Sequence, residues 1–209
     1  MDSKFNDGRL AVIIPCFNEE IAIGKVVREA KKFLPRANLY VFDNNSTDQT
    51  AARAREAGAH VIISPLQGKG CVVRHAFRII DADYYMLIDG DDTYPLEEAA
   101  KILDPVINRN FGMAIGTRFD HPQDGSFRKF HVTGNRIFSL VVSILFHQKI
   151  TDMLSGYRVL SRDLVDQLRI HSKGFEIETD LTLQAISKDF SIMEVPVSYR
   201  ARPVGSHSK

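Results

Sequence analysis

The chain has 209 residues, of which 44% are hydrophobic and 25% are charged, and its 27 basic and 26 acidic residues leave a net charge of +1. This ordinary globular composition excludes a disordered acidic tail, and the even charge balance excludes a dedicated nucleic-acid binder. The two cysteines, Cys16 and Cys71, exclude a disulfide scaffold and favour a reducing compartment.

The length predicts one domain spanning residues 1–209, because a domain of about 150 residues is typical. Residues 1–9 carry no long apolar segment and do not fit a secretory signal peptide. The longest strongly apolar stretch, residues 137–146, is shorter than the roughly 20 residues that a membrane-spanning helix needs. We therefore expect a chain that is soluble or peripheral to a membrane.

Residues 10–116 alternate between short apolar runs and segments of helical periodicity. We expect Asn18 to cap the first helix and Pro105 to disturb the end of the fourth. This alternation predicts an α/β fold, an open and mostly parallel central sheet flanked by helices. The predicted strands are residues 10–16, 39–42, 59–63, 84–88 and 111–116, and the predicted helices are residues 23–34, 47–57, a segment directly after Gly68-Lys69-Gly70, and 95–107.

Beyond residue 118 the alternation weakens. Helical spacing predicts helices at residues 132–147, 161–169 and 175–187, and an apolar run predicts a last strand at 192–199. The sequence shows neither an internal repeat nor a low-complexity linker. We interpret residues 1–118 and 119–209 as two halves of one domain.

Polar residues gather where three of the predicted strands end. In open α/β sheets, ligands bind beyond the carboxyl ends of the strands. A single aspartate at such a place is more often a turn residue, but clusters after three strands favour a binding site. The clusters are Asn18, Glu19 and Glu20 after the first strand, Asp43, Asn44 and Asn45 after the second, and Asp89, Asp91 and Asp92 after the fourth.

The strongest of these signals is Asp89-Gly90-Asp91-Asp92, which places three carboxylates within four residues. Neighbouring carboxylates repel one another, and Mg²⁺ or Mn²⁺ prefers oxygen ligands and usually takes others from a bound diphosphate. The alternative is an exposed acidic turn. A calcium loop is excluded because Tyr94 and Ala100 stand where it needs Gly and Glu, and a P-loop is excluded because Gly70 follows Gly68-Lys69.

Several motifs, in a fixed order, resemble those of the family 2 glycosyltransferases of GT-A fold. Within that family the chain is similar to the branch of dolichyl-phosphate mannose and glucose synthases and bacterial polyprenyl-phosphate sugar transferases. The matching segments are residues 13–20 (IIPCFNEE), 43–48 (DNNSTD), 68–70 (GKG), 89–92 (DGDD), 116–118 (GTR), 152–158 (DMLSGYR), 174–178 (GFEIE), 195–197 (VPV) and 202–209 (RPVGSHSK).

The resemblance implies a Rossmann-like GT-A sheet with a nucleotide-sugar site in residues 1–118 and an acceptor site in residues 119–209. It implies that Asp89 and Asp91 hold Mg²⁺ or Mn²⁺ and that Arg202 closes over the donor phosphates. The residues implied in nucleotide-sugar binding are Pro15, Asn18, Glu20, Asp43, Asn45, Lys69, Asp89, Gly90, Arg202 and Lys209. The residues implied in catalysis are Asp91 and Arg202, together with Arg118, Arg136 and Arg158, which would face an acceptor phosphate.

The activity implied by this resemblance is metal-dependent and inverting. It moves a sugar from a UDP- or GDP-sugar to a polyprenyl phosphate of the undecaprenyl or dolichyl type, at the cytoplasmic face of a membrane and without a nucleic-acid partner. A phosphate monoester is anionic at neutral pH and therefore needs cations rather than a base. The alternative is a family 2 enzyme with a glycan or other hydroxyl acceptor, which needs a carboxylate base such as Glu178 or Asp180.

The same residues argue against two other functional classes. A nucleotidyltransferase would be expected to carry a glycine-rich, basic loop directly after the first strand, and residues 17–20 do not provide one. A non-catalytic nucleotide-sugar-binding module would not need Asp89 and Asp91, so their presence favours an enzyme.

Overall fold

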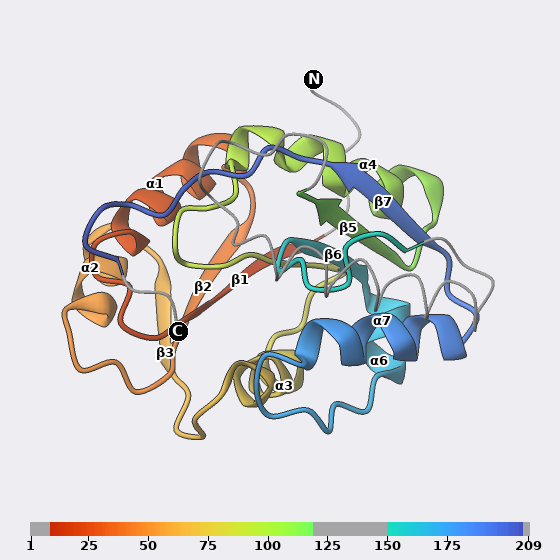
Figure 1. Cartoon of the computed structure of the whole chain (residues 1–209), viewed down its shortest axis with the longest axis horizontal. Coiled ribbons are helices and arrows are strands. Elements are labelled where there is room, and N and C mark those ends of the chain that lie inside the picture. Colours follow the sequence, from red (N-terminus) through yellow and green to blue (C-terminus); the bar gives the residue numbers. More distant parts are fainter. Residues whose placement is uncertain (1–8, 119–149, 207–209) are drawn as a thin grey trace.

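A seven-stranded mixed sheet runs through the middle of the molecule (Figure 1). The structure, a computed structural model, describes residues 9–118 and 150–206. The strands lie in the order β3-β2-β1-β4-β6-β5-β7. Their bounds are β1 Leu10–Cys16, β2 Asn38–Asp43, β3 His60–Ile63, β4 Tyr84–Leu87, β5 Met113–Thr117, β6 Arg158–Ser161 and β7 Ile192–Pro196.

Every strand pairing is parallel except the two that β6 makes with β4 and β5. The predicted open and mostly parallel sheet is therefore confirmed. The sequence pattern does not predict β6, because only two of its four residues, Val159 and Leu160, are apolar and they form no recognisable apolar run. This strand matters for the site, because it places Arg158 between two neighbouring strands in the interior of the sheet.

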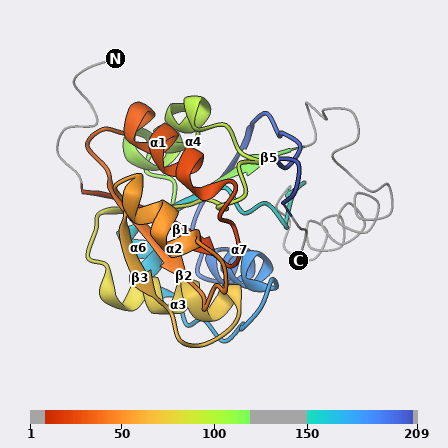
Figure 2. The same ribbon diagram turned by 90° about the vertical axis from the view of Figure 1, so that its left-hand side faces the viewer.

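Helices cover both faces of the sheet (Figures 1 and 2). Side chains of β1 alternate between the two faces: Val12 and Ile14 pack in one core, and Ala11 and Ile13 pack in the other. Burial on both faces explains why this strand is a continuous apolar run. On one face lie α1 (Ile23–Phe33), α2 (Thr50–Glu56), the 3₁₀ turn η1 (Leu96–Glu98) and α4 (Ala99–Arg109), and on the other lie α3 (Lys69–Ile79), α6 (Arg162–Gln167) and α7 (Ile177–Ser187).

Two local predictions are wrong. Asn18 does not cap the first helix: its φ is +54°, and α1 begins only after Ala22. Pro105 does not disturb the end of the fourth helix, because α4 continues past it to Arg109. Its end is formed instead by Asn110, whose left-handed φ of 58° lets its backbone N–H donate to the Pro105 carbonyl. The predicted helix at residues 132–147 lies outside the described residues.

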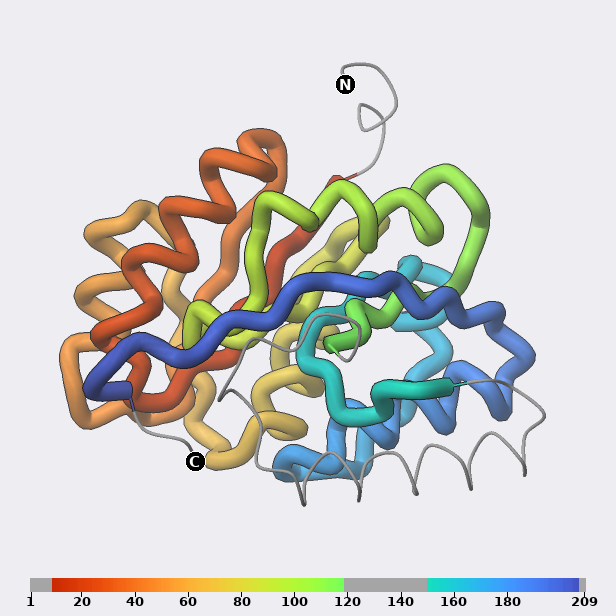
Figure 3. The backbone as a smooth tube through the Cα atoms, turned by 45° about the horizontal axis from the view of Figure 1, so that its top comes forward, coloured from red at the N-terminus to blue at the C-terminus, as the bar shows by residue number. Residues whose placement is uncertain are grey.

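Residues 197–206, termed here the C-terminal strap, leave β7 and cross the molecule towards α1 and α2 (Figure 3). The Val197 N–H donates to the Thr117 carbonyl at 3.0 Å, and the Arg200 N–H donates to the Thr93 carbonyl at 2.8 Å. The strap therefore passes over the end of β5 and over the loop that follows β4. None of the helices within residues 9–118 and 150–206 combines the length and hydropathy that crossing a lipid bilayer requires.

Candidate active site

The polar clusters after β1, β2 and β4 meet at one edge of the sheet. β1 pairs in parallel with β2 on one side and β4 on the other, so the carboxyl ends of all three strands lie together. The Asn44 N–H donates to the Cys16 carbonyl at 2.8 Å, and the Thr47 N–H donates to Asn18 Oδ1 at 2.8 Å. The structure thus brings the first two predicted clusters into contact.

Within these loops, several predicted nucleotide-binding side chains hold neighbouring loops in place. Glu20 Oε2 accepts from the Gln49 N–H at 2.9 Å, and Asn45 Nδ2 donates to the Pro65 carbonyl at 3.0 Å. Asp43 is buried, and its Oδ1 accepts from the Ser46 N–H at 3.2 Å. These bonds fix the walls of the candidate site, and whether the same residues contact a nucleotide stays a prediction.

Asp91 lies buried at the end of β4 and faces the C-terminal strap. Its Oδ2 accepts from Arg202 Nη2 at 2.7 Å, and its Oδ1 accepts from Thr93 Oγ1 at 2.6 Å. Burial and the nearby charge of Asp89 raise the pKa of Asp91 above its ordinary value, against the opposing effect of Arg202. The structure therefore brings together two residues, Asp91 and Arg202, that the sequence analysis assigned to the same diphosphate.

The residues at this place fit a divalent cation that also binds a diphosphate. Asp89 and Asp91 are close enough for the charge of one to raise the pKa of the other, and a cation between them would remove that repulsion. Within the two described ranges, no group of three or more His, Cys, Asp or Glu side chains is arranged to hold a metal. The protein would thus supply two carboxylates, with the other ligands coming from donor oxygens and water.

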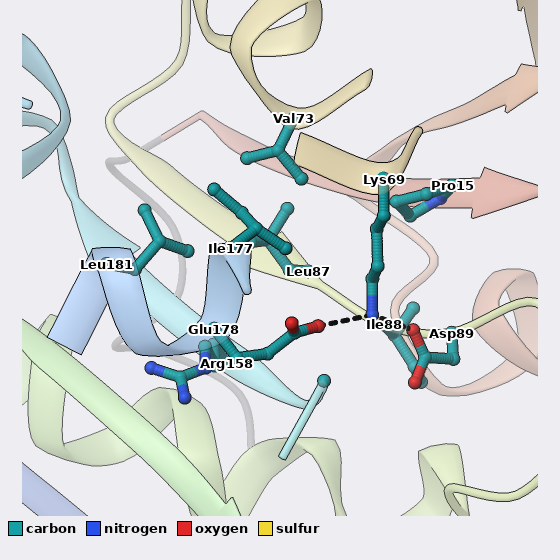
Figure 4. Close-up of a pocket in the computed structure, with 11 residues that line it drawn as sticks. Pro15, Lys69, Val73, Leu87, Ile88, Asp89, Arg158, Ile177, Glu178 and Leu181 are labelled. Carbon is teal, nitrogen blue, oxygen red and sulfur yellow. Dashed lines mark hydrogen bonds and ion pairs between the residues drawn. The ribbon is translucent and has the colours of Figure 1, made fainter. Parts of the chain in front are cut away.

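Lys69 stands between two carboxylates, as Figure 4 shows. Its Nζ lies 2.5 Å from Asp89 Oδ1 and 2.5 Å from Glu178 Oε1. Burial alone lowers the pKa of Lys69, but the charges of Asp89 and Glu178 outweigh burial and raise this pKa, so the ammonium stays protonated. Burial alone raises the pKa of Asp89, but Lys69 outweighs it and the pKa falls, so this carboxylate stays ionised.

This ion-paired arrangement changes the interpretation of Lys69 and Glu178. The sequence predicts that Lys69 binds the nucleotide sugar. Its ammonium pairs with two carboxylates of the protein, and contact with a nucleotide stays a prediction. Glu178 was a candidate base for a hydroxyl acceptor, and it is buried and accepts a hydrogen bond from Lys69. Sequence reasoning missed the pairing because Lys69 and Glu178 are 109 residues apart.

The Asp89 carboxylate packs against Gly156, where there is no space for a side chain. A Cβ added at Gly156 would lie 2.4 Å from Asp89 Oδ2, closer than unbonded atoms approach. Gly90, the next residue along the chain, lies close to β1, because a Cβ there would lie 2.5 Å from Cys16 Sγ. The backbone around Asp89 is therefore fitted closely to the position of this carboxylate.

Replacing Gly156 with alanine should displace the Asp89 carboxylate and weaken nucleotide binding about tenfold to a hundredfold, since misplacement by about 1 Å costs that much at a positioned group. Isothermal titration with UDP and GDP in the presence of Mn²⁺ measures the effect. Gly24→Ala is the matched control, because its added Cβ meets only the guanidinium end of Arg28, at 3.2 Å. Equal nucleotide affinity in both variants would contradict this role of Gly156.

Arg118 is held rigidly near Asp89, and its charge helps to lower the pKa of that carboxylate. Its Nε and Nη2 donate to Asp152 Oδ2 and Oδ1 at 2.8 and 2.7 Å, a two-point pairing with a fully buried carboxylate. Glu194 on β7 fixes the loop that carries Asp152, because its Oε1 accepts from the Asp152 N–H at 3.0 Å. The Arg118 guanidinium also lies 5.5 Å from the Tyr199 ring centroid. Asp152 belongs to one of the matching motifs, but the sequence alone does not indicate its role.

Arg158 does not occupy the place predicted for it. It is fully buried, and its guanidinium donates to the Ser155 carbonyl, the Met153 carbonyl and Thr182 Oγ1 at 2.8, 2.8 and 2.7 Å. The expectation that Arg158 faces an acceptor phosphate is corrected, because these internal bonds turn its guanidinium into the protein interior. The other two predicted cations, Arg136 and Lys209, lie outside the described residues.

Replacing Arg158 with methionine should lower the free energy of unfolding by about 2–4 kcal/mol, because the change leaves several buried acceptors without a donor. Chemical denaturation measures the loss. The matched control is Arg109→Met, since Arg109 is half-exposed in a surface ion pair with Asp104 and such pairs contribute about 0–1 kcal/mol. If the two variants were equally stable, the buried bonds of Arg158 would not contribute as described.

The chain is similar in sequence to known proteins. Residues 11–169 match the family model described as glycosyl transferase family 2. The chain is 34% identical over 198 residues to the glycosyltransferase AglJ of Haloferax volcanii, covering 94% of this chain and 65% of that protein. It is 30% identical over 193 residues to a dolichyl-phosphate hexose transferase of the same organism, covering 92% of this chain and 83% of that protein.

A similar fold occurs in a solved structure. Glucosyl-3-phosphoglycerate synthase from Mycobacterium tuberculosis, in complex with Mn²⁺, uridine diphosphate and phosphoglyceric acid, matches with a TM-score of 0.78 at 22% sequence identity. The match covers 95% of this chain and 72% of that chain. At this level of identity the likeness shows the fold, and the mixed sheet flanked by helices is the shared feature.

Proposed function

The chain belongs to glycosyltransferase family 2 and is a glycosyltransferase, and on this premise we propose that it transfers a sugar from a UDP- or GDP-sugar to a polyprenyl phosphate with the aid of Mg²⁺ or Mn²⁺. The observation that carries the proposal is the pairing of Glu178 with Lys69 at 2.5 Å. This pairing removes the carboxylate that a hydroxyl acceptor would need as a base.

The second candidate base is engaged as well. Asp180 accepts from the Ser172 N–H at 3.3 Å and from Gln184 Nε2 at 2.7 Å. A phosphate monoester needs no base, because its second pKa is about 6 and it is doubly anionic for most of the time at neutral pH. It needs a fixed cation instead, and Arg118, whose guanidinium Asp152 holds in place, supports that need.

The donor side is assigned to Asp89, Asp91 and Arg202. A divalent cation held by the two aspartates would supply positive charge to the departing diphosphate. Arg202 already lies 2.7 Å from Asp91, so its guanidinium can exchange the carboxylate for a donor phosphate with little movement. In the reaction, a phosphate oxygen of the acceptor bonds to the anomeric carbon. The bond from that carbon to the diphosphate breaks, which inverts the configuration.

Names and complexes of similar proteins support this choice of substrates. One relative is named a dolichyl-phosphate hexose transferase, and others are named polyprenol monophosphomannose synthase and undecaprenyl-phosphate mannosyltransferase. The structure of similar fold from Mycobacterium tuberculosis was solved with Mn²⁺ and uridine diphosphate. The proposed acceptor is a membrane lipid, so we also propose that the enzyme works at the cytoplasmic face of a membrane.

A mass-spectrometric transfer assay tests the proposal. Detergent-dispersed polyprenyl phosphate is combined with Mg²⁺ or Mn²⁺ and with a panel of UDP- and GDP-sugars. The expected result is one glycosyl-phosphate lipid, formed from one donor and lost when the cation is chelated. Transfer from the same donor to a glycan hydroxyl, with none to the lipid phosphate, would overturn it in favour of the hydroxyl-acceptor alternative.

A further inference from the structure

Three elements far apart in the sequence meet at the Lys69 ammonium. Lys69 is the first residue of α3, Asp89 follows β4, and Glu178 lies in the first turn of α7 (Figure 4). The side chains of Lys69 and Glu178 are only 14% and 7% exposed, whereas that of Asp89 is 27% exposed. Asp89 is therefore the member of this triad that a ligand can reach, and Glu178 stands behind it.

The backbone on both sides of the triad is locked together. The Gly70 N–H donates to the Gly174 carbonyl at 3.1 Å, and the Cys71 N–H donates to the Lys173 carbonyl at 3.2 Å. Gly68, at φ +116°, has no room for a side chain, because a Cβ there would lie 2.2 Å from the Lys173 carbonyl oxygen. These bonds occupy N–H groups in the first turn of α3 and fix the start of α3 against the loop that precedes α7.

Because these bonds fix the start of α3 against the loop before α7, they hold Lys69 and Glu178 close together. Asp89 is then gripped from two directions, by Lys69 at Oδ1 and by the close backbone of Gly156 at Oδ2. We propose that Glu178 is a positioning residue that acts through Lys69 to hold the Asp89 carboxylate in its donor-binding orientation. This inference rests on the proposed function in that Asp89 faces the donor.

The charges of Lys69, Asp89 and Glu178 predict that removing Lys69 alone is more harmful than removing Lys69 and Glu178 together. One ammonium stands between two carboxylates, and charges in a poorly solvated site interact strongly. Removing Lys69 leaves Asp89 and Glu178 facing each other without a cation. Removing Glu178 leaves Lys69 paired with Asp89 alone. The ammonium can then move with the Asp89 carboxylate and compete with the donor for the carboxylate oxygens. Removing both leaves Asp89 as a single carboxylate.

The test compares Lys69→Met, Glu178→Gln and the double variant. Lys69→Met should be the most harmful of the three, and adding Glu178→Gln to it should improve both the melting temperature and the affinity for UDP or GDP with Mn²⁺, by about tenfold for the affinity. Glu178→Gln alone should raise the donor KM about tenfold, change kcat less than about fivefold, and leave the acceptor KM unchanged.

A surface pair provides the control. Arg53 and Glu56 lie 3.4 Å apart on α2, with side chains 58% and 65% exposed, so Arg53→Met and Glu56→Gln should combine almost additively. A merely structural role for Glu178 would not move the donor KM alone and would overturn the inference. So would a general-base role, which would lower kcat of Glu178→Gln about a hundredfold or more at unchanged donor KM.

The binding and melting measurements need no acceptor, so they separate this inference from the proposed function. If the wild-type protein fails to glycosylate polyprenyl phosphate but the double variant recovers nucleotide affinity, the function fails and the positioning role stands. If the double variant is as harmed as Lys69→Met in both binding and melting, the positioning role fails whatever the acceptor is.

Discussion

Replacing Asp91 with asparagine should reduce sugar transfer about a hundredfold to a thousandfold, the range seen when one group that stabilises a developing charge is removed. The neutral amide keeps the contact with Thr93 but provides no anionic ligand for a cation on the departing diphosphate. Transfer rates at saturating donor, measured across a Mn²⁺ titration, check this. A variant that kept metal-dependent turnover would contradict the assignment.

The same substitution should not destabilise the metal-free protein. Burial and Asp89 raise the pKa of Asp91 in the folded state above the unfolded value of about 3.9. The folded state therefore holds this proton to higher pH than the unfolded state does, and wild-type stability falls as pH rises through that window. An amide does not titrate, so the stability of Asp91→Asn relative to wild type should increase above about pH 4.

Urea denaturation in the presence of a chelator, repeated from about pH 4 to pH 7, measures this relative stability. If the unfolding free energy of the variant fell below that of the wild type as pH rose, Asp91 would be a stabilising carboxylate. That result would contradict the raised pKa of Asp91 in the folded state. The same denaturation series on Asp43→Asn provides a comparison with Asp91→Asn, because Asp43 is also a buried aspartate.

Replacing Arg118 with alanine should lower transfer to polyprenyl phosphate about a hundredfold, because a fixed cation would be lost from the acceptor side of the site. Nucleotide affinity should stay unchanged, since the donor contacts are assigned to Asp89, Asp91 and Arg202. Initial rates with varied acceptor, together with titration of UDP or GDP, separate the two effects. An unchanged acceptor KM and kcat would contradict a role for Arg118 in acceptor binding.

A control is needed because Arg118→Ala also leaves the fully buried carboxylate of Asp152 without its partner, which costs about 3–5 kcal/mol. The double variant Arg118→Ala with Asp152→Asn removes that unpaired charge and should recover folding without recovering transfer. If the double variant recovered transfer as well, the defect would come from misfolding and Arg118 would not be an acceptor contact.

The sequence predicts the fold of residues 9–118 well because the signals there are local. The uninterrupted run at residues 10–16 has the bounds of β1, and the aspartates after residue 88 fall at the sheet edge where the loops meet. Each of these features depends on residues a few positions apart. The predicted α/β sheet and the family assignment both follow from them.

The contacts that organise the site are not local, and for that reason the sequence does not reveal them. Lys69 meets Glu178 across 109 residues, and Arg202 meets Asp91 through the course of the C-terminal strap. Arg118 and Arg158 illustrate the same limit: both are arginines in quoted motifs, yet one pairs with Asp152 at the site and the other is buried within the sheet. The antiparallel insertion of β6, which has no apolar run that would predict a strand, places Arg158 within the sheet.

The most direct test of the central claim compares two acceptors that differ only in the phosphate. Polyprenyl phosphate and the unphosphorylated polyprenol of the same chain length are each incubated with the preferred donor and Mn²⁺, and the lipid products are identified by mass spectrometry. The account predicts a glycosyl-phosphate product from the first and none from the second. Glycosylation of the polyprenol at a comparable rate would contradict it, because that reaction requires a base that Glu178, paired with Lys69, does not provide.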